Sequence, residues 1–210
     1  EQLLQNKIER ILVNTHYQPE QVVNHIEQSK YKEFVDIVHE DTLLNTGGTL
    51  LKNKNYFNNE ALMLVHADNL CVCDWSSFIA SHQNRHEEVV ITMMTFDSDE
   101  PESCGIVNVD EKSIVVKYFE KNKNPPSGKA NAAVYIVEPS VIDDLEQMGK
   151  EKLDFSYDVI PKYMGRIGTF HNDMYHRDIG TLESYSLAQI ESLELVLPLN
   201  PGDGNLDTIG

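Results

Sequence analysis

The sequence predicts an α/β fold, with a mixed and mostly parallel sheet flanked by helices, and three observations support this prediction. Residues 62–65 form an apolar run that ends soon afterwards at Asp68, as is typical of an inner strand covered on both faces. Strand-like and helix-like segments alternate along the first half of the chain, an order that favours parallel pairing through right-handed crossovers. In the second half, strand-like segments follow one another with little room for helical crossovers, so part of the sheet should be antiparallel.

The first half of the chain contains the alternating elements. Leu3, Leu4 and Ile8 share one face of a first helix. Pro19 suits the first turn of a second helix, and Asp74 is placed to cap another one. The expected helices cover residues 1–9, 19–28, a segment opening at 46–48, and 75–84, and the expected strands cover 10–14, 34–39, 62–67 and 89–96.

The second half holds the closely spaced strands. Their expected bounds are residues 105–109, 114–120 and 132–137. A loop containing two prolines and a glycine should occupy 121–129, and helices are expected over 140–148 and 181–193. The prolines and glycines within residues 196–210 predict a turn-rich tail. We therefore expect one domain over residues 1–195.

Charge and cysteine content restrict the class of protein. The 210 residues carry a net charge of −17, from 34 acidic and 17 basic side chains, which opposes binding to nucleic acid or to an anionic membrane surface. No apolar run approaches the length of a membrane span. The three cysteines, Cys71, Cys73 and Cys104, are an odd number and too few for a structural zinc site. We expect a cytoplasmic protein.

Two aspartates end extended segments that lie far apart in the sequence. Asp68 follows the apolar run, and Asp178 ends the segment 175–178. Ligands of open α/β sheets bind beyond the carboxyl ends of the strands, where a carboxylate can hold a divalent cation against phosphate groups. Each aspartate alone also suits a loop or helix cap, which is the ordinary role of such residues.

Other candidate site residues lie at the ends of predicted strands and helices. Gly47 and Gly48, after Thr46, permit close approach to a base or phosphate at a helix start. Gly105 opens a strand, where glycine often marks close approach of a backbone or ligand. Three polar residues at strand ends can bind sugar hydroxyls or a phosphate, although solvated surface roles are the default for each: Glu120, Lys121 and Asn131.

The order of these motifs resembles that of the sugar-1-phosphate nucleotidyltransferases, also called nucleoside-diphosphate-sugar pyrophosphorylases. The matching segments run in the family's order through residues 11–17, 44–48, 67–69, 104–107, 119–121, 131–135, 154–158 and 178–181. The resemblance implies a Rossmann-like sheet and the transfer of a nucleoside monophosphate from an NTP to a sugar 1-phosphate, with release of pyrophosphate.

The resemblance also implies roles for individual residues. Asp68 and Asp178 would hold Mg²⁺ and serve catalysis. The turn Thr46-Gly47-Gly48 would contact the base of the nucleotide. The sugar 1-phosphate would be bound by Gly105, Glu120, Lys121 and Asn131. The expected partners are the NTP and the sugar 1-phosphate, with neither nucleic acid nor membrane, and with a homodimer as a candidate assembly.

The sequence departs from the family's pattern in three places. The first strand of the family, its Gly-rich loop with an arginine, and a downstream Pro-Lys pair have no counterpart, so we expect the chain as given to be inactive and to continue a missing N-terminal segment. Asn45 stands where glycine or glutamine is usual, and Arg177 replaces a more neutral residue. The turn Thr46-Gly47-Gly48 is most similar to the mannose- and heptose-1-phosphate guanylyltransferase branch.

Two other functions remain open on the sequence alone. One is a non-catalytic subunit that binds sugar nucleotides and serves regulation or assembly. The other is a metal-dependent glycosyltransferase, in which Asp68 would bind the diphosphate of a nucleotide sugar; the ending 178–181 argues against it.

Overall fold

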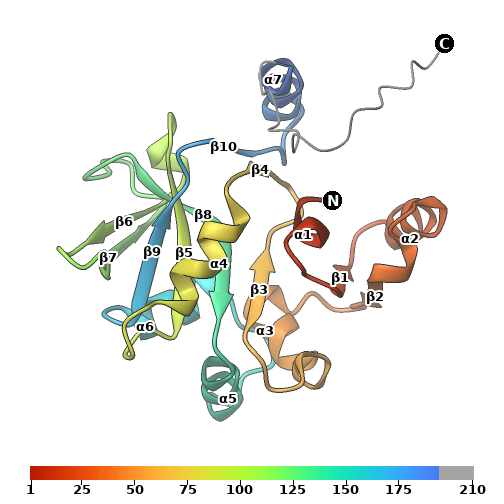
Figure 1. Ribbon diagram of the computed structural model, residues 1–210, viewed down its shortest axis with the longest axis horizontal. Coiled ribbons are helices and arrows are strands. Elements are labelled where there is room, and N and C mark those ends of the chain that lie inside the picture. The colour runs from red at the N-terminus through yellow and green to blue at the C-terminus, as the bar shows by residue number, and fades with distance from the viewer. Residues whose placement is uncertain (194–210) are drawn as a thin grey trace.

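The computed structural model describes residues 1–193 and shows helices around a central sheet (Figure 1). The helices are α1 (Gln2–Gln5), α2 (Pro19–Gln28), α3 (Asn45–Lys52), α4 (Trp75–Gln83), α5 (Pro139–Gln147), α6 (Ile160–Tyr163) and α7 (Leu182–Ser192), with short 3₁₀ turns η1 (Lys32–Phe34), η2 (Lys54–Phe57) and η3 (Pro101–Ser103), and a π-helix η4 (Phe155–Val159). The strands are β1 (Ile11–Thr15), β2 (Val35–His39), β3 (Leu62–Val65), β4 (Asn69–Val72), β5 (Ile91–Asp97), β6 (Gly105–Val109), β7 (Val115–Glu120), β8 (Lys129–Val137), β9 (Ile167–His171) and β10 (Tyr175–Asp178). The predicted tail over 196–210 lies outside the described residues.

The first helix is shorter than its sequence predicts. The pattern of apolar residues favours a helix over 1–9, but α1 ends at Gln5. Lys7 adopts a left-handed φ of 64°, which a continuing right-handed helix does not permit. The chain then enters β1.

The large sheet is organised around β8. Strands β3 and β6 share one edge of β8, β5 lies on its other edge, β9 follows β5, and β7 lies outside β6. The expected mixed α/β class is confirmed. Four of the six strands, β3, β5, β6 and β9, run in one direction, but β8 runs between them in the opposite one. Most neighbouring pairs are therefore antiparallel, and the expected predominance of parallel pairs is wrong.

Strands β1 and β2 form a separate parallel pair. Figure 1 shows this pair at one end of the molecule and β6–β7 at the other. Within residues 1–193, β1 pairs only with β2 and β3 only with β8, so each has one open edge.

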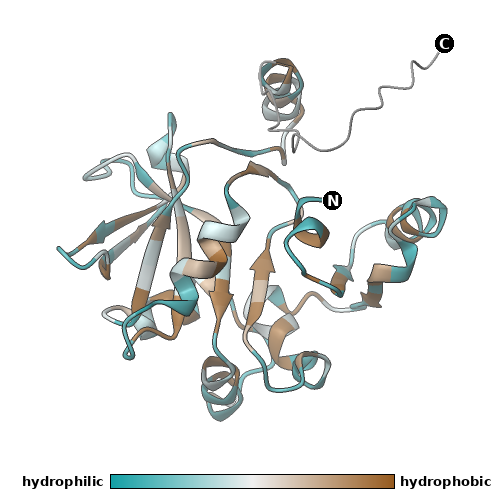
Figure 2. Cartoon of the chain, viewed as in Figure 1, coloured by the Kyte–Doolittle hydropathy of each residue, from teal (hydrophilic) through white to brown (hydrophobic). Residues whose placement is uncertain are grey.

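Apolar side chains fill both faces of the large sheet. On one face, Met93 and Tyr135 pack with residues from α3, α5, α6 and η4. On the other, Met94 and Val134 pack with Trp75 and Phe78 of α4. Successive residues of one strand thus point into different cores, as the pleat of a strand requires. Apolar residues follow the central strands, and the peripheral loops are polar (Figure 2). Among the residues described here, no helix combines the length and apolar character needed to span a bilayer.

Candidate active site

A bulge in β8 lies at the centre of the candidate site. Extra residues are inserted between Asn131 and Tyr135, which pair with Thr95 and Met93 of β5. Within the bulge, Ala133 takes a left-handed φ of 51°. Bulges redirect side chains and interrupt strand pairing, and here the interruption lies between the positions where β3 and β6 meet β8. Groups from several elements can therefore reach this point.

The pairing of β4 with β10 brings Asp68 and Asp178 together. Asp178 stands opposite Asn69, and the carbonyl oxygen of Asp68 accepts a hydrogen bond of 2.7 Å from the N–H of Ile179. A methyl carbon placed on Gly180 would lie 3.0 Å from Asp178 Oδ1 and 3.6 Å from Asp68 Oδ2. The two carboxylates therefore face the same small volume, beside a glycine that leaves it open.

The carbonyl oxygen of Ala132 connects the aspartates to the bulge. It accepts hydrogen bonds from Asn69 Nδ2 at 3.1 Å and from His176 Nε2 at 2.8 Å. Burial lowers the pKa of His176, so its ring is a neutral donor, and it stacks on Phe96 with ring centroids 4.2 Å apart. Asn69, next to Asp68, and His176, two residues before Asp178, are thus hydrogen-bonded to the same peptide group.

The donor set of the two aspartates fits Mg²⁺ in chemical type. Magnesium is commonly held by one or two carboxylates, with phosphate oxygens and water completing the coordination. Across residues 1–193, no group of three or more His, Cys, Asp and Glu side chains is arranged to hold a metal. The protein therefore offers a pair of carboxylates and leaves the remaining positions to a ligand; metal binding itself stays a prediction.

Polar residues predicted to bind a sugar lie along the neighbouring strands. Gly105 pairs directly with Glu120 across β6 and β7, and Glu120 accepts a hydrogen bond from the hydroxyl of Tyr118. Asn131 Nδ2 donates to Tyr135 Oη at 2.6 Å. Burial raises the pKa of Tyr135, and the charge of Glu120 makes a smaller contribution in the same direction. Neither tyrosine was identified from the sequence.

The start of α3 packs against the segment that leads into η4. Gly47 and Gly48 both donate their N–H groups to the carbonyl oxygen of Leu153, at 2.9 and 3.1 Å. A methyl carbon on Gly47 would lie 3.0 Å from the Cβ of Leu153, so glycine permits this approach. Thr46 Oγ1 accepts a hydrogen bond of 3.0 Å from the N–H of Phe155. The two glycine N–H groups are thus used inside the protein, and contact of this turn with a base stays a prediction.

Glu40 is a buried acid that sequence analysis missed. Its side chain is fully inaccessible and accepts hydrogen bonds from the N–H of Leu44 at 3.1 Å and from Thr49 Oγ1 at 2.9 Å. It therefore fixes the start of α3 to the end of β2. Between these contacts, Asn45 has a left-handed φ of 62°, a conformation in which glycine and asparagine are the usual residues. This explains why asparagine replaces glycine there without disturbing the turn.

The predicted site residues divide into three groups in space. Asp68 and Asp178 converge at Gly180, and a second group, made up of Gly105, Glu120 and Asn131, lies along β6, β7 and β8. The third group, Thr46 to Gly48, contacts the loop before η4. Lys121 is exposed at the end of β7, where its ammonium makes no ion pair within the part of the chain that the structure describes.

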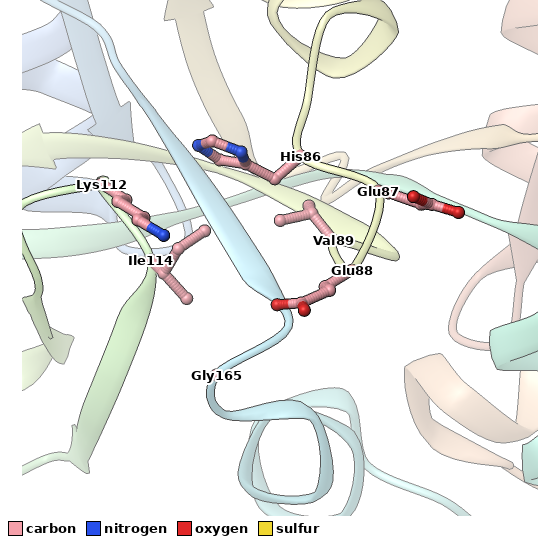
Figure 3. A pocket seen from close by; sticks show the side chains of 7 residues that line it. All are labelled: His86, Glu87, Glu88, Val89, Lys112, Ile114 and Gly165. Carbon is pink, nitrogen blue, oxygen red and sulfur yellow. The ribbon is translucent and has the colours of Figure 1, made fainter.

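One cavity of about 260 Å³ lies away from these groups, near the start of β5 and β9 (Figure 3). It is lined by His86, Glu87, Glu88, Val89, Lys112, Ile114 and Gly165, none of which is a predicted site residue. The candidate site lies near the opposite ends of these strands.

Comparison with known proteins identifies the family of this chain. The family model described as Nucleotidyl transferase matches residues 1–194. Glucose-1-phosphate adenylyltransferase of Thermomicrobium roseum is 31% identical over 150 residues, which cover 69% of this chain and 35% of that protein. Mannose-1-phosphate guanylyltransferase of Mycobacterium tuberculosis is 26% identical over 196 residues, which cover 91% of this chain and 54% of that protein.

The chain spans about a third to a half of the length of the curated relatives it matches. Among solved structures, HddC from Yersinia pseudotuberculosis complexed with GMP-PN has a TM-score of 0.76 and 23% sequence identity, over 90% of this chain and 81% of that one. At this identity, the likeness shows a shared fold.

Proposed function

The chain belongs to the nucleotidyl transferase family, and on this premise we propose that the protein transfers a nucleoside monophosphate from an NTP to a sugar 1-phosphate, releasing pyrophosphate. The observation that carries the proposal is the convergence of Asp68 and Asp178 at Gly180, fastened through Ala132 to the strand that carries Asn131. A pair of carboxylates beside a group of hydroxyl-binding residues suits a substrate pair made of phosphates and a sugar.

The chemistry asks the protein mainly to position two anions. A phosphate oxygen of the sugar 1-phosphate attacks the α-phosphorus of the NTP; one P–O bond forms while the bond to pyrophosphate breaks. Alignment of the two reactants supplies much of the rate enhancement in such transfers. Glu120 and Asn131 would accept and donate hydrogen bonds to sugar hydroxyls, and Lys121 would bind the sugar phosphate.

Asp68 and Asp178 would hold Mg²⁺. When bound, the cation supplies positive charge to the phosphates of both substrates. This assignment also accounts for phosphate binding by a protein whose net charge is −17. The pairing of β4 with β10 holds the two carboxylates in fixed positions next to each other. Neither carboxylate needs to transfer a proton.

Guanosine triphosphate with mannose or heptose 1-phosphate is the substrate pair that we propose first. It is supported by the turn Thr46-Gly47-Gly48 and by the relative named mannose-1-phosphate guanylyltransferase. The relatives named glucose-1-phosphate adenylyltransferase make ATP with glucose 1-phosphate the competing pair. We place the reaction in the cytoplasm, in keeping with three cysteines that are free. A homodimer stays a prediction that light scattering would test.

The test is pyrophosphate release by the complete gene product with Mg²⁺, across the four NTPs crossed with several sugar 1-phosphates. Turnover of one pair would support the proposal and identify both substrates. A folded protein that releases no pyrophosphate with any pair would contradict it. Binding of nucleotide sugars without turnover would then favour a sensor, and transfer to an acceptor without pyrophosphate would favour a glycosyltransferase.

A further inference from the structure

Tyr118 lies between two residues of the proposed sugar pocket. Gly105 pairs with Glu120 across β6 and β7, and Tyr118 precedes Glu120 by two positions on β7. Residues two apart on a strand share a face, so the phenol projects on the side of Glu120 and lies diagonally across from Gly105.

The phenol of Tyr118 occupies the space that a side chain at Gly105 would need. A methyl carbon placed on Gly105 would overlap the hydroxyl of Tyr118 and lie 2.7 and 2.8 Å from two of its ring carbons. Glycine is therefore required at position 105 by the neighbouring side chain of Tyr118. The sequence alone suggests instead that a ligand or another backbone approaches closely there. Tyr118 thus covers the surface that Gly105 would otherwise present.

The same phenol uses part of the hydrogen-bonding capacity of Glu120. Its hydroxyl donates to Glu120 Oε2, while Oε1 accepts no hydrogen bond from any residue that the structure describes. Burial raises the pKa of Tyr118, and the contact with Glu120 raises it further, so the phenol remains protonated and remains a donor. One carboxylate oxygen is held in place and the other is left for a ligand.

We propose that Tyr118 is a specificity-determining residue: it forms one wall of the sugar pocket over Gly105 and leaves Glu120 a single oxygen with which to bind a sugar hydroxyl. The inference rests on the proposed function, since that function assigns Gly105 and Glu120 to sugar binding. The class of ligand is a hexose or heptose 1-phosphate, distinguished from its epimers by the one hydroxyl that meets Glu120 Oε1.

Two substitutions separate the two effects of the phenol. Tyr118→Phe keeps the ring but releases Glu120, and we expect the KM for the preferred sugar 1-phosphate to rise about tenfold, as for the loss of a hydrogen bond to a charged group. Tyr118→Leu also opens the wall, and we expect the ratio of kcat/KM between the preferred sugar and its epimer to fall by about tenfold. The KM for the NTP should be unchanged in both variants.

Tyr163→Phe is the matched control. Tyr163 is a buried tyrosine whose hydroxyl likewise donates to a carboxylate, Asp144 Oδ2 at 2.6 Å, but it lies on α6, outside the proposed pocket. A purely structural role for a tyrosine–carboxylate pair would change stability in both proteins. Only Tyr118→Phe should change the KM for the sugar 1-phosphate while leaving that for the NTP unaltered.

The measurements use the complete gene product, with a thermal melt for each variant. Equal sugar preference and equal KM values in wild type and Tyr118→Phe would overturn the inference, whether or not Tyr118→Leu folds. If the wild type turns over no pair, the proposed function fails separately, and calorimetry with mannose 1-phosphate and glucose 1-phosphate decides on Tyr118. If Tyr118→Phe binds the preferred sugar 1-phosphate as tightly as the wild type does, or if the wild type binds neither sugar, the inference is overturned.

Discussion

In the proposed function, Asp68 and Asp178 should matter to chemistry and little to stability. Both side chains are exposed, and their contacts with the protein are local. We therefore expect Asp68→Asn and Asp178→Asn, made in the complete gene product, each to abolish turnover. The free energy of unfolding should change by less than about 0.5 kcal/mol, as for most surface substitutions.

Pyrophosphate release and denaturant melts would check this expectation. Asp99→Asn, at another exposed aspartate in a loop, is the control and should retain full activity. Near-normal turnover in either site variant would remove the reason to assign the carboxylates to a metal.

His82 is a buried histidine whose protonation should affect stability. Its Nδ1 lies 2.7 Å from Thr92 Oγ1, and its Nε2 lies 2.9 Å from Glu138 Oε1, which also pairs with Arg85. Burial lowers the pKa of His82 below its ordinary value, and the charge of Arg85 lowers it too, although Glu138 opposes this shift. The unfolded chain therefore binds the proton more readily than the folded protein.

The sign of the pH dependence follows from that difference. The stability due to neutral His82 is fully present above the ordinary histidine pKa of about 6.5 and is lost as pH falls through the lower pKa of the folded state. Urea melts between about pH 5 and 8 should show a free energy of unfolding that decreases toward acid. In His82→Gln the decrease should be shallower, while exposed His25→Gln should behave as the wild type. Parallel curves for all three proteins would contradict the expectation.

Single residues were predictable when their role depends on position along the chain. Asp68 and Asp178 end extended segments, and this pattern, together with the order of the other motifs, was sufficient to pair them. Tyr118 and Glu40 were not predictable, because their partners are set by strand register and by helix packing, which the local sequence does not encode. The left-handed φ of Asn45 likewise became evident only in the folded chain.

At the scale of elements, α7 depends on one anchoring carboxylate. Arg177 on β10 donates to both oxygens of Glu191, at 2.6 and 2.7 Å, and Tyr175 Oη donates to the same group at 2.7 Å. Ala188 is the one buried residue of this helix. Arg177, which departs from the family's pattern, thus has a structural role in holding α7.

We expect Glu191→Ala to loosen α7 without unfolding the protein. Amide hydrogen exchange should become faster across Leu182–Ser192, and protection of β5 and β8 should be unchanged. Glu183→Ala, an exposed acid on the first turn of the same helix, is the control. Equal exchange rates for α7 in wild type and Glu191→Ala would show that the ion pair does not hold it.

Elements with strong periodicity were predicted well, and short ones were not. The expected helix over 75–84 corresponds to α4, and Asp74 caps it by accepting from the N–H of Ser77 at 3.0 Å. Strands β4 and β9 were missed. β4 begins directly after a turn at Asp68, and β9 is a short segment with little alternation, so its strand conformation comes from pairing with β5. The π-helix η4 carries no period that distinguishes it from an ordinary helix.

At the scale of the whole molecule, the chain's net charge of −17 should act on the anionic substrates of the proposed reaction before they bind. Long-range repulsion slows the encounter of like charges and is screened by salt, with a Debye length of about 30 Å at 0.01 M and about 8 Å at 0.15 M. We expect kcat/KM for the NTP to rise with NaCl over this range at fixed free Mg²⁺. Potassium glutamate in place of NaCl controls for a specific effect of chloride. A fall of kcat/KM with salt would mean that a local cationic group dominates the approach.

The separation of β1–β2 from the large sheet has a consequence for cooperativity. No backbone ladder joins the two sheets within residues 1–193, and Glu40 is a main polar link from the end of β2 to α3. In the 210-residue chain, residues 11–39 should therefore behave as a distinct foldon, which opens at a lower free energy than the rest of that chain. Native-state hydrogen exchange at increasing denaturant concentration should show two opening isotherms, one for residues 11–39 and one for the rest of the chain. Glu40→Gln should lower the opening free energy of residues 11–39 only. In the 210-residue chain, such a unit can open without disturbing the core that holds the aspartates.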